Sequence, residues 1–462
     1  MKINWPSRNP RVGTNAESME QAAPAQAALI QPSGMAIPRV SFNYGRIFLL
    51  GFGFFGVSVI WGVYNAFVPI FLADKFHLAP IWIGFFMTLD NIAALFIQPP
   101  VGAWSDRLRT KIGRRLPFIL IGAPIGAVAF GLIPVAGILP LFVACTSTLI
   151  LSMAIWRTPV VALMPDITPS EKRSQANGII NFMGGIGTII ALQTGGTLYK
   201  LSPNFPFWMG SVLVILAALM VLLFIKEPKH YDESEKEPNM FASLREVLTD
   251  KDKSALRLFL AIFFWFIGYA AVEAFFTLYA NKHLGLNEGD SATLLSVLPL
   301  LFVIFAIPSG ILASKIGRRV TISVGLVLMA AILFCLYIFP PARLLSPVTK
   351  LPLVGIPLVS GGPRMLTLAG VFLMIAGIAW SFVNINSLPM VLDMTNSTRL
   401  GTYTGLYYLF STLSAIVGPN VNGWTIQLTS GNYNNIMLFA PIFMIIALVL
   451  LWGVRRGEAA IA

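Results

Sequence analysis

Apolar runs of about 20 residues recur along this chain, and they limit what it can fold into. A helix of that length crosses a hydrocarbon layer roughly 30 Å thick. Of 462 residues, 56% are hydrophobic and only 11% are charged, whereas a soluble protein carries roughly 25% charged residues. Inside lipid the backbone must satisfy its own hydrogen bonds, which a helix does. The sequence therefore predicts an all-α integral membrane protein of about twelve transmembrane helices.

A polar stretch divides these runs into two sets of six. We expect an N-terminal half over residues 47–226, a cytoplasmic linker over 227–257 and a C-terminal half over 258–454. Residues 1–46, rich in Ala, Pro, Gln and Ser, are expected to form a disordered cytoplasmic tail, and 455–462 a second tail. The predicted spans are 47–72, 80–104, 117–136, 139–163, 175–199, 206–226, 258–281, 290–313, 320–339, 366–390, 400–425 and 434–454.

Basic residues fix the expected orientation. With the N-terminus in the cytoplasm, 25 of the 32 Lys and Arg residues fall on the cytoplasmic side and six on the outside, in agreement with the positive-inside rule. We therefore expect a multi-pass protein of the cytoplasmic (inner) membrane with both chain ends in the cytoplasm. Because this excess accounts for most of the net charge of +12, no nucleic-acid partner is needed to explain it.

The reactive side chains give no sign of catalysis. Both cysteines, Cys145 and Cys335, lie within apolar runs, where a thiol usually acts as a small core residue. Metal-ligand clusters and nucleophiles with a paired base are absent from the sequence at any useful spacing. We therefore predict no metal, no cofactor and no enzymatic activity.

Two loop motifs occur once in each half. A Gly, a polar residue four positions on and a later Gly-Arg-Arg follow both the second and the eighth run. An Asp with a Thr two residues later also recurs, at an offset of 227 residues. Parallel repeats of this kind mark transporter folds, so we expect the halves to be duplicated. The motif residues are Gly102, Asp106, Arg107, Gly113, Arg114, Arg115 and Asp166 in the first half and Gly317, Arg318, Arg319 and Asp393 in the second.

These motif residues are interpreted as a gate. Arg114 and Arg115 are placed to bridge Asp106 to neighbouring helix ends, in an interaction made in one conformation of a transport cycle and broken in the other. The alternative is that basic loops merely stop membrane insertion. That alternative explains the arginines but not the paired Gly, Asp and Thr spacing.

The same loops carry a resemblance to a known family. Two six-helix halves with Gly-x-x-x-Asp-Arg and Gly-Arg-Arg after the second helix resemble the major facilitator superfamily. More narrowly, residues 99–107 with Gly-Arg-Arg-Leu-Pro-Phe at 113–118 resemble the glycoside-pentoside-hexuronide symporters and the plant sucrose carriers with their animal relatives. Residues 162–168 and 173–177 strengthen this likeness. The resemblance implies cation-coupled uptake of a sugar or glycoside by alternating access.

One departure from that family bears on the coupling ion. Melibiose-type members have two aspartates one turn apart before the Pro-x-x-Gly of the second helix, and those positions are Ala94 and Gln98 here. A sodium site of that kind is therefore disfavoured. The resemblance to the sucrose-carrier branch implies proton coupling instead.

Three ionisable residues lie inside predicted spans: Asp90, Arg157 and Glu273. An Arg or Asp costs at least ~2.5 kcal/mol at the bilayer centre, so such a residue faces a cavity or a partner. At 1.5 Å per residue, Asp90 and Glu273 lie about 21 and 22 Å from the inner ends of their spans, and Arg157 only about 9 Å. A buried carboxyl group favours its neutral form, which suits it to gain and lose a proton. We predict that Asp90 or Glu273 carries the proton.

For Arg157, the difference in depth argues against a direct pair with Asp90, and we expect it to bind substrate hydroxyls or a carboxylate. The alternative for all three charged residues is that they pair with one another or with backbone carbonyls and fix helix packing. Sugar binding also needs aromatic faces and forked hydrogen-bonding side chains around one cavity. The predicted binding residues are Asn65, Asn91, Arg157, Tyr269, Trp380 and Asn384.

Three functions remain consistent with these features. A proton-coupled sugar symporter is favoured by an amide-rich, aromatic-lined cavity. A proton-driven exporter of drugs or lipophilic molecules is the alternative, because fold alone names neither substrate nor direction. A non-transporting membrane sensor is the weakest. The expected partners are a small-molecule substrate, protons and the lipid bilayer, with the monomer as the functional unit.

Overall fold

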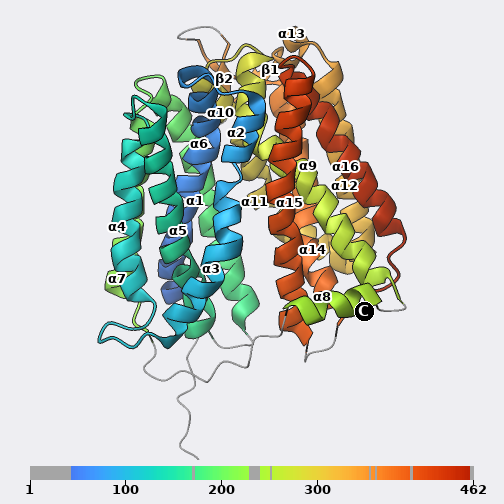
Figure 1. Ribbon diagram of the computed structural model, residues 1–462. Coiled ribbons are helices and arrows are strands. Elements are labelled where there is room, and N and C mark those ends of the chain that lie inside the picture. Colours follow the sequence, from blue (N-terminus) through green and yellow to red (C-terminus); the bar gives the residue numbers. More distant parts are fainter. Residues whose placement is uncertain are drawn as a thin grey trace, which may run out of the picture. The chain divides into compact units, whose positions relative to one another are not determined.

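The computed structural model describes residues 43–168, 172–227, 240–249, 252–352, 355–358, 362–395 and 399–457. The chain is almost entirely helical over these residues (Figure 1). Nearly all of the tail predicted for residues 1–46, and residues 228–239 and 250–251 of the predicted linker, lie outside them.

The first half comprises helices α1 to α7. Asn43 caps α1, since its side chain accepts a hydrogen bond from the backbone N–H of Arg46 at 3.1 Å. Prolines stand in the first turn of α2, α4, α5 and α7, where their missing N–H costs no hydrogen bond. The elements are α1 (Tyr44–Ile70) with a π-helical turn (Phe71–Lys75), α2 (Pro80–Phe86), α3 (Leu89–Arg107), α4 (Leu116–Leu132), α5 (Leu139–Ile167), α6 (Arg173–Tyr199) and α7 (Phe205–Phe224).

A short helix, α8 (Met240–Thr249), precedes the second half, which comprises α9 to α16. Its elements are α9 (Ser254–Lys282), α10 (Glu288–Leu295), α11 (Val297–Ile316), α12 (Arg318–Ile338), α13 (Pro341–Leu344), α14 (Leu368–Leu392), α15 (Leu400–Leu428), a 3-10 turn (Tyr433–Asn435) and α16 (Ile436–Trp452). Strands β1 (Pro347–Lys350), β2 (Ile356–Pro357) and β3 (Arg364–Thr367) form an antiparallel sheet in the order β1-β3-β2 between α12 and α14.

Every predicted span overlaps at least one helix. Within the described residues, ten helical segments are long and apolar enough to cross a membrane. The 17-residue α4 and the 29-residue α15 complete the set of twelve. The prediction of an all-α membrane protein with about twelve transmembrane helices is confirmed.

Two spans expected to be continuous are each interrupted at one position. The second span breaks between α2 and α3, where the Thr88 hydroxyl donates to the carbonyl of Phe85 at 2.7 Å. The eighth breaks between α10 and α11, where the Ser296 hydroxyl donates to the carbonyl of Thr293 at 2.6 Å. Thr88 and Ser296 are 208 positions apart, which is also the spacing of Gly102 and Gly310, the first residues of the loop motif after each break. The break is therefore part of the repeat.

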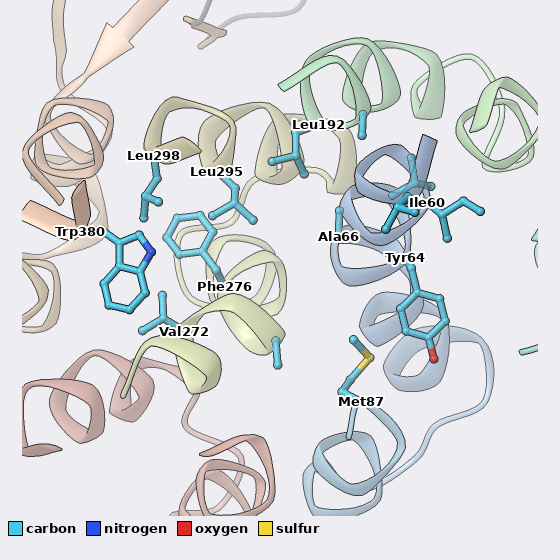
Figure 2. Close-up of a cluster of buried hydrophobic side chains, with 14 of the residues drawn as sticks. Ile60, Tyr64, Ala66, Met87, Leu192, Val272, Phe276, Leu295, Leu298 and Trp380 are labelled. Carbon is cyan, nitrogen blue, oxygen red and sulfur yellow. The ribbon is translucent and has the colours of Figure 1, made fainter. Parts of the chain in front are cut away.

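The two halves contact each other through α2 with α15 and α6 with α10. Both contacts lie toward the end of the bundle that carries the β-sheet, which we call the opposite end (Figure 1). The end that carries the two Gly-Arg-Arg loops is called the Arg-rich end. Buried side chains of both halves, including Tyr64 of α1 and Trp380 of α14, continue this packing inward (Figure 2).

Candidate functional site

Asp90 lies in the first turn of α3, directly after the helix break. Its Oδ1 accepts a hydrogen bond from Asn91 Nδ2 at 2.9 Å. The N-terminus of a helix carries partial positive charge, which stabilises a nearby carboxylate. The break therefore gives Asp90 an anion-stabilising environment that a continuous helix would lack.

Arg157 lies deeper than the sequence predicted. Helix α5 continues to Ile167 instead of ending near residue 163, which puts Arg157 ten residues, or about 15 Å, from the helix end. Arg157 and Asp90 line one small cavity. The predicted depth of about 9 Å was thus too small, because it rested on a helix end placed four residues too early.

Glu273 faces the first half from α9. Its side chain is exposed although its neighbours Val272 and Ala274 are buried, and its Oε1 accepts a hydrogen bond from Asn65 Nδ2 of α1 at 3.5 Å. Glu273 thus combines an exposed side chain in the middle of a 29-residue helix with a hydrogen bond to the other half. Asp90 interacts electrostatically with both Arg157 and Glu273. The three embedded charged residues therefore belong to one cluster.

The predicted aromatic binding residues pack against each other. The rings of Tyr269 and Trp380 stack with centroids 3.8 Å apart and planes 3° from parallel, and Phe266 meets Trp380 edge-on. Trp380 is only 4% exposed. One face of its indole is thus already covered by Tyr269. Asn384, one turn further along α14, is half-buried.

The structure adds three residues to the site. Trp61 and Gln98 line the cavity beside Asp90 and Arg157. Tyr408 of α15 is 57% exposed and interacts electrostatically with Arg157 from the other half. Trp61 precedes Asn65 by four residues, so helical spacing alone could have placed both on one face.

Charged side chains at the Arg-rich end form a compact network within the first half. Arg115 Nη2 lies 2.5 Å from Asp106 Oδ1, and its Nε lies 3.0 Å from Asp166 Oδ2. Arg114 Nη2 lies 2.7 Å from Asp166 Oδ1. The two arginines therefore tie the loop after α3 to the end of α5. Arg107 is exposed in the last turn of α3, and no ion pair to it occurs among the described residues.

Glu227, beyond the end of α7, completes this network and was not anticipated from the sequence. Its carboxylate accepts hydrogen bonds from the backbone N–H groups of Arg114, Arg115 and Leu116 at 2.7–2.8 Å. It thus caps the start of α4. Gly113 has a φ of +124°, and a Cβ there would overlap the Glu227 carboxylate. That overlap and the positive φ are the physical reasons for glycine in this motif.

The second half repeats this arrangement with fewer charges. Arg318 pairs with Asp393 and donates to the carbonyl of Pro389 at 2.9 Å. Arg319 donates to the carbonyls of Val454 and Trp452 at 3.0 and 2.9 Å, so it holds the end of α16. Gly317 has a φ of +93°. Each of these motif interactions stays within its own half.

At the opposite end, charged pairs cross between the halves. Lys200, directly after α6, pairs with Asp290 of α10, and Lys282 of α9 pairs with Asp74 of the first half. Arg364 of β3 also donates to Thr197 of α6 at 2.9 Å. The halves are therefore joined at this end in the conformation described.

A family comparison accounts for this architecture. The family described as the Major Facilitator Superfamily matches residues 50–369. The chain belongs to the Major Facilitator Superfamily. This confirms the broader resemblance drawn from the loop motifs, and members of this superfamily are membrane transporters.

Two curated relatives have names that refer to different classes of molecule. Multidrug resistance protein 2 of Bacillus subtilis (strain 168) is 23% identical over 416 residues, covering 88% of this chain and 94% of the relative. The general alpha-glucoside permease of Schizosaccharomyces pombe is 23% identical over 281 residues, covering 54% of this chain and 50% of the permease. Both matches are at 23% identity, so each name describes the relative and not this chain.

A solved structure shares the fold. A bacterial homologue of the human lysosomal transporter Spinster, in an inward-facing and occupied conformation, has a TM-score of 0.67 to this chain at 14% sequence identity. The match covers 88% of this chain and 95% of that one. At this identity the likeness concerns the superfamily fold alone.

Proposed function

We propose that this transporter is a proton-coupled importer of a sugar or glycoside that works by alternating access, with its Arg-rich end in the cytoplasm. The observation that carries the proposal is the cluster of Asp90, Arg157 and Glu273, drawn from α3, α5 and α9. Charged side chains at this depth are costly and mark substrate or proton pathways.

Proton coupling is supported by the partners of the two carboxyl groups. Asp90 is bonded by the amide of Asn91, and Glu273 by the amide of Asn65. An amide NH2 group donates to a carboxylate, and an amide oxygen accepts from a carboxylic acid. The same neighbours therefore serve both protonation forms. Gln98, where melibiose-type members have an aspartate, lines the cavity with an uncharged group.

A sugar is supported by the chemistry around this cluster. Trp61 offers a ring at the cavity, and Gln98 and Arg157 offer hydrogen-bond donors beside it. Aromatic faces with a few polar groups are typical of small-molecule sites. The likeness to the alpha-glucoside permease and the Arg-Arg-Leu-Pro-Phe motif favour the same substrate class.

A proton-driven exporter of lipophilic molecules is the second candidate. The match to the multidrug resistance protein extends over 88% of this chain. Two acids against one base leave the cluster with net negative charge when both acids are ionised, which suits a lipophilic cation.

Transport by purified protein in liposomes under an imposed pH gradient separates these candidates. Radiolabelled maltose and sucrose are the sugar probes, and ethidium is the cation probe. We expect proton-driven accumulation of a sugar that is lost in Asp90→Asn or Glu273→Gln, with Asp252→Asn outside the membrane as control. Ethidium transport without any sugar transport would establish the exporter instead, and full proton-driven accumulation by both variants would exclude these carboxyl groups as proton carriers.

A further inference from the structure

The break in front of Asp90 is contacted from the other half of the molecule. Asn420 of α15 donates through Nδ2 to the Thr88 hydroxyl oxygen at 3.2 Å and to its own helix carbonyl at Ile416 at 2.7 Å. Thr88 is fully buried, and its own proton is donated to the Phe85 carbonyl. The Thr88 hydroxyl is therefore used both as donor and as acceptor.

This contact depends on close approach of the two halves. A Cβ on Gly84 of α2 would overlap the carbonyl oxygen of Pro419, the residue before Asn420. Gly423, one turn further along α15, lies equally close to the carbonyl of Pro80. Asn420 can reach Thr88 only while α2 and α15 are in this backbone contact. Separation of the halves at the opposite end would remove it.

The break frees backbone N–H groups at the start of α3 from helical hydrogen bonding, and both the Thr88 hydroxyl and the Asp90 carboxylate can accept hydrogen bonds from them. Within the described residues, the N–H groups of Leu89, Asp90 and Asn91 have no backbone acceptor, as expected at a helix start. A hydroxyl at the N-cap position, which is Thr88, and a carboxylate in the first turn, which is Asp90, are the usual acceptors there. Thr88 makes no capping bond, because its hydroxyl is directed toward the Phe85 carbonyl and Asn420 instead of the N–H groups of α3. These N–H groups at the start of α3 are thus available to the Asp90 carboxylate.

We propose that Asn420 is a positioning residue that makes the charge state of Asp90 depend on conformation. While the halves are joined at the opposite end, Asn420 holds Thr88 and the start of α3 stabilises the Asp90 anion. When the halves separate there, Thr88 is released to cap α3, the anion loses that stabilisation, and Asp90 takes up a proton. Closure reverses the exchange and releases the proton. The inference rests on the proposed function, in which Asp90 carries the proton inward.

Asn420 is uncharged, and the charged and titratable groups around Asp90 come from other residues. They are Tyr64 from α1, Arg157 from α5 and Glu273 from α9. Replacing Asn420 leaves all three in place, so a change in Asp90 titration would be traced to the helix terminus. The second break supplies a matched control. Ser296 makes the same hydroxyl-to-carbonyl bond as Thr88, but the counterpart of Asp90, 208 positions on, is Leu298.

Infrared difference spectra of the purified full-length protein, recorded from about pH 4 to 9, test this without a known substrate. The carboxyl band that disappears in Asp90→Asn reports Asp90. We expect Asn420→Ala to move the midpoint of this band by about 0.5–1 pH unit toward alkaline pH, the effect of roughly one hydrogen bond. Thr88→Val should move it by a similar amount toward acid, while Thr88→Ser and Ser296→Ala leave it in place.

Unchanged midpoints in both Asn420→Ala and Thr88→Val would overturn the inference but leave Asp90 as proton carrier. A failure of the proposed function looks different, because Asp90→Asn would then remove no titrating band. Should Asn420→Ala not fold, Thr88→Val still decides the question through the opposite shift. A shift of equal size in Ser296→Ala would also overturn the inference, since it would trace the effect to general loosening of the broken helices.

Discussion

Gly196 on α6 and Gly289 on α10 pack backbone to backbone across the interface between the halves. A Cβ on either residue would overlap the carbonyl oxygen of the other. Neither glycine has a positive φ, so the requirement for a small residue comes from the neighbour and not from the local conformation. Substitution at this contact can therefore test whether closure of the opposite end is part of a transport cycle.

We expect Gly196→Ala to disfavour closure at that end. Overpacking of a tight contact costs about 1–3 kcal/mol, which corresponds to a shift of about five- to 150-fold in a conformational equilibrium. The labelling rate of a cysteine introduced at Thr293, which is buried in the contact, should rise accordingly. Gly178→Ala on the same helix is the control, because nothing lies within 4 Å of a Cβ there. Equal labelling in the two variants would contradict the prediction.

The two charged pairs at the opposite end are expected to differ in strength. The Asp290 side chain is 5% exposed and also accepts from Asn287 Nδ2 at 2.5 Å, whereas both members of the Lys282–Asp74 pair are more than a third exposed. Lys200→Met leaves a buried carboxylate short of its charge partner and should cost about 1–3 kcal/mol of stability. Lys282→Met should cost about 0–1 kcal/mol. Thermal unfolding in detergent compares them, and the reverse ranking would refute this account.

Glu227 is expected to stabilise the loop network at the Arg-rich end. Glu227→Gln replaces a carboxylate that accepts three backbone hydrogen bonds with an amide that has one acceptor oxygen. The loss should be about 1–3 kcal/mol, because at least one N–H group of α4 is left unpaired. Thermal unfolding is the measurement, with Glu288→Gln as the control. If the two variants unfold alike, Glu227 is not the cap that holds α4.

Acid sensitivity is expected to depend on His283, just beyond α9 and outside its membrane-spanning segment. Burial lowers the pKa of His283 below its ordinary value of 6.5, and its ring stacks on Tyr279 with centroids 5.3 Å apart. The folded state therefore binds this proton more weakly than the unfolded state, so stability falls as pH drops below about 6.5.

His283→Phe keeps the ring but removes the titration. Its melting temperature should fall less than that of the unmodified protein between about pH 7.5 and 5.5. His77→Phe, at an exposed position, is the control. A parallel loss of stability in the unmodified protein and in His283→Phe would contradict the prediction.

The sequence revealed the embedded charged residues because they are rare in apolar runs. Asp90, Arg157 and Glu273 stand out by composition alone, but all three predicted depths were too small, because α3, α5 and α9 extend beyond the predicted span ends. The helix break before Asp90 could not be predicted from the sequence. No Gly or Pro stands next to Thr88, and its hydrogen-bond partner Asn420 lies 332 positions away.

Other features depend in the same way on distant partners. Glu227 caps a helix that begins 111 positions earlier in the chain, and nothing near Arg114 indicates it. The spacing of Trp380 and Asn384 places both on one face of α14, but the ring that covers Trp380 belongs to Tyr269 of α9. Sequence pattern predicts which residues share a helix face, whereas the neighbour that occupies that face is set by tertiary packing.

The matching breaks at Thr88 and Ser296 bear on how the two halves came to differ. Both copies kept the hydroxyl-to-carbonyl bond that bends the helix. Only one copy carries a carboxyl group two residues later, and the other has Leu298 there. The bend is therefore shared by the two halves, and the carboxyl group distinguishes them. Two identical halves would carry two carboxyl groups or none at these bends, so the single carboxyl group of Asp90 makes the two halves of this chain chemically unequal.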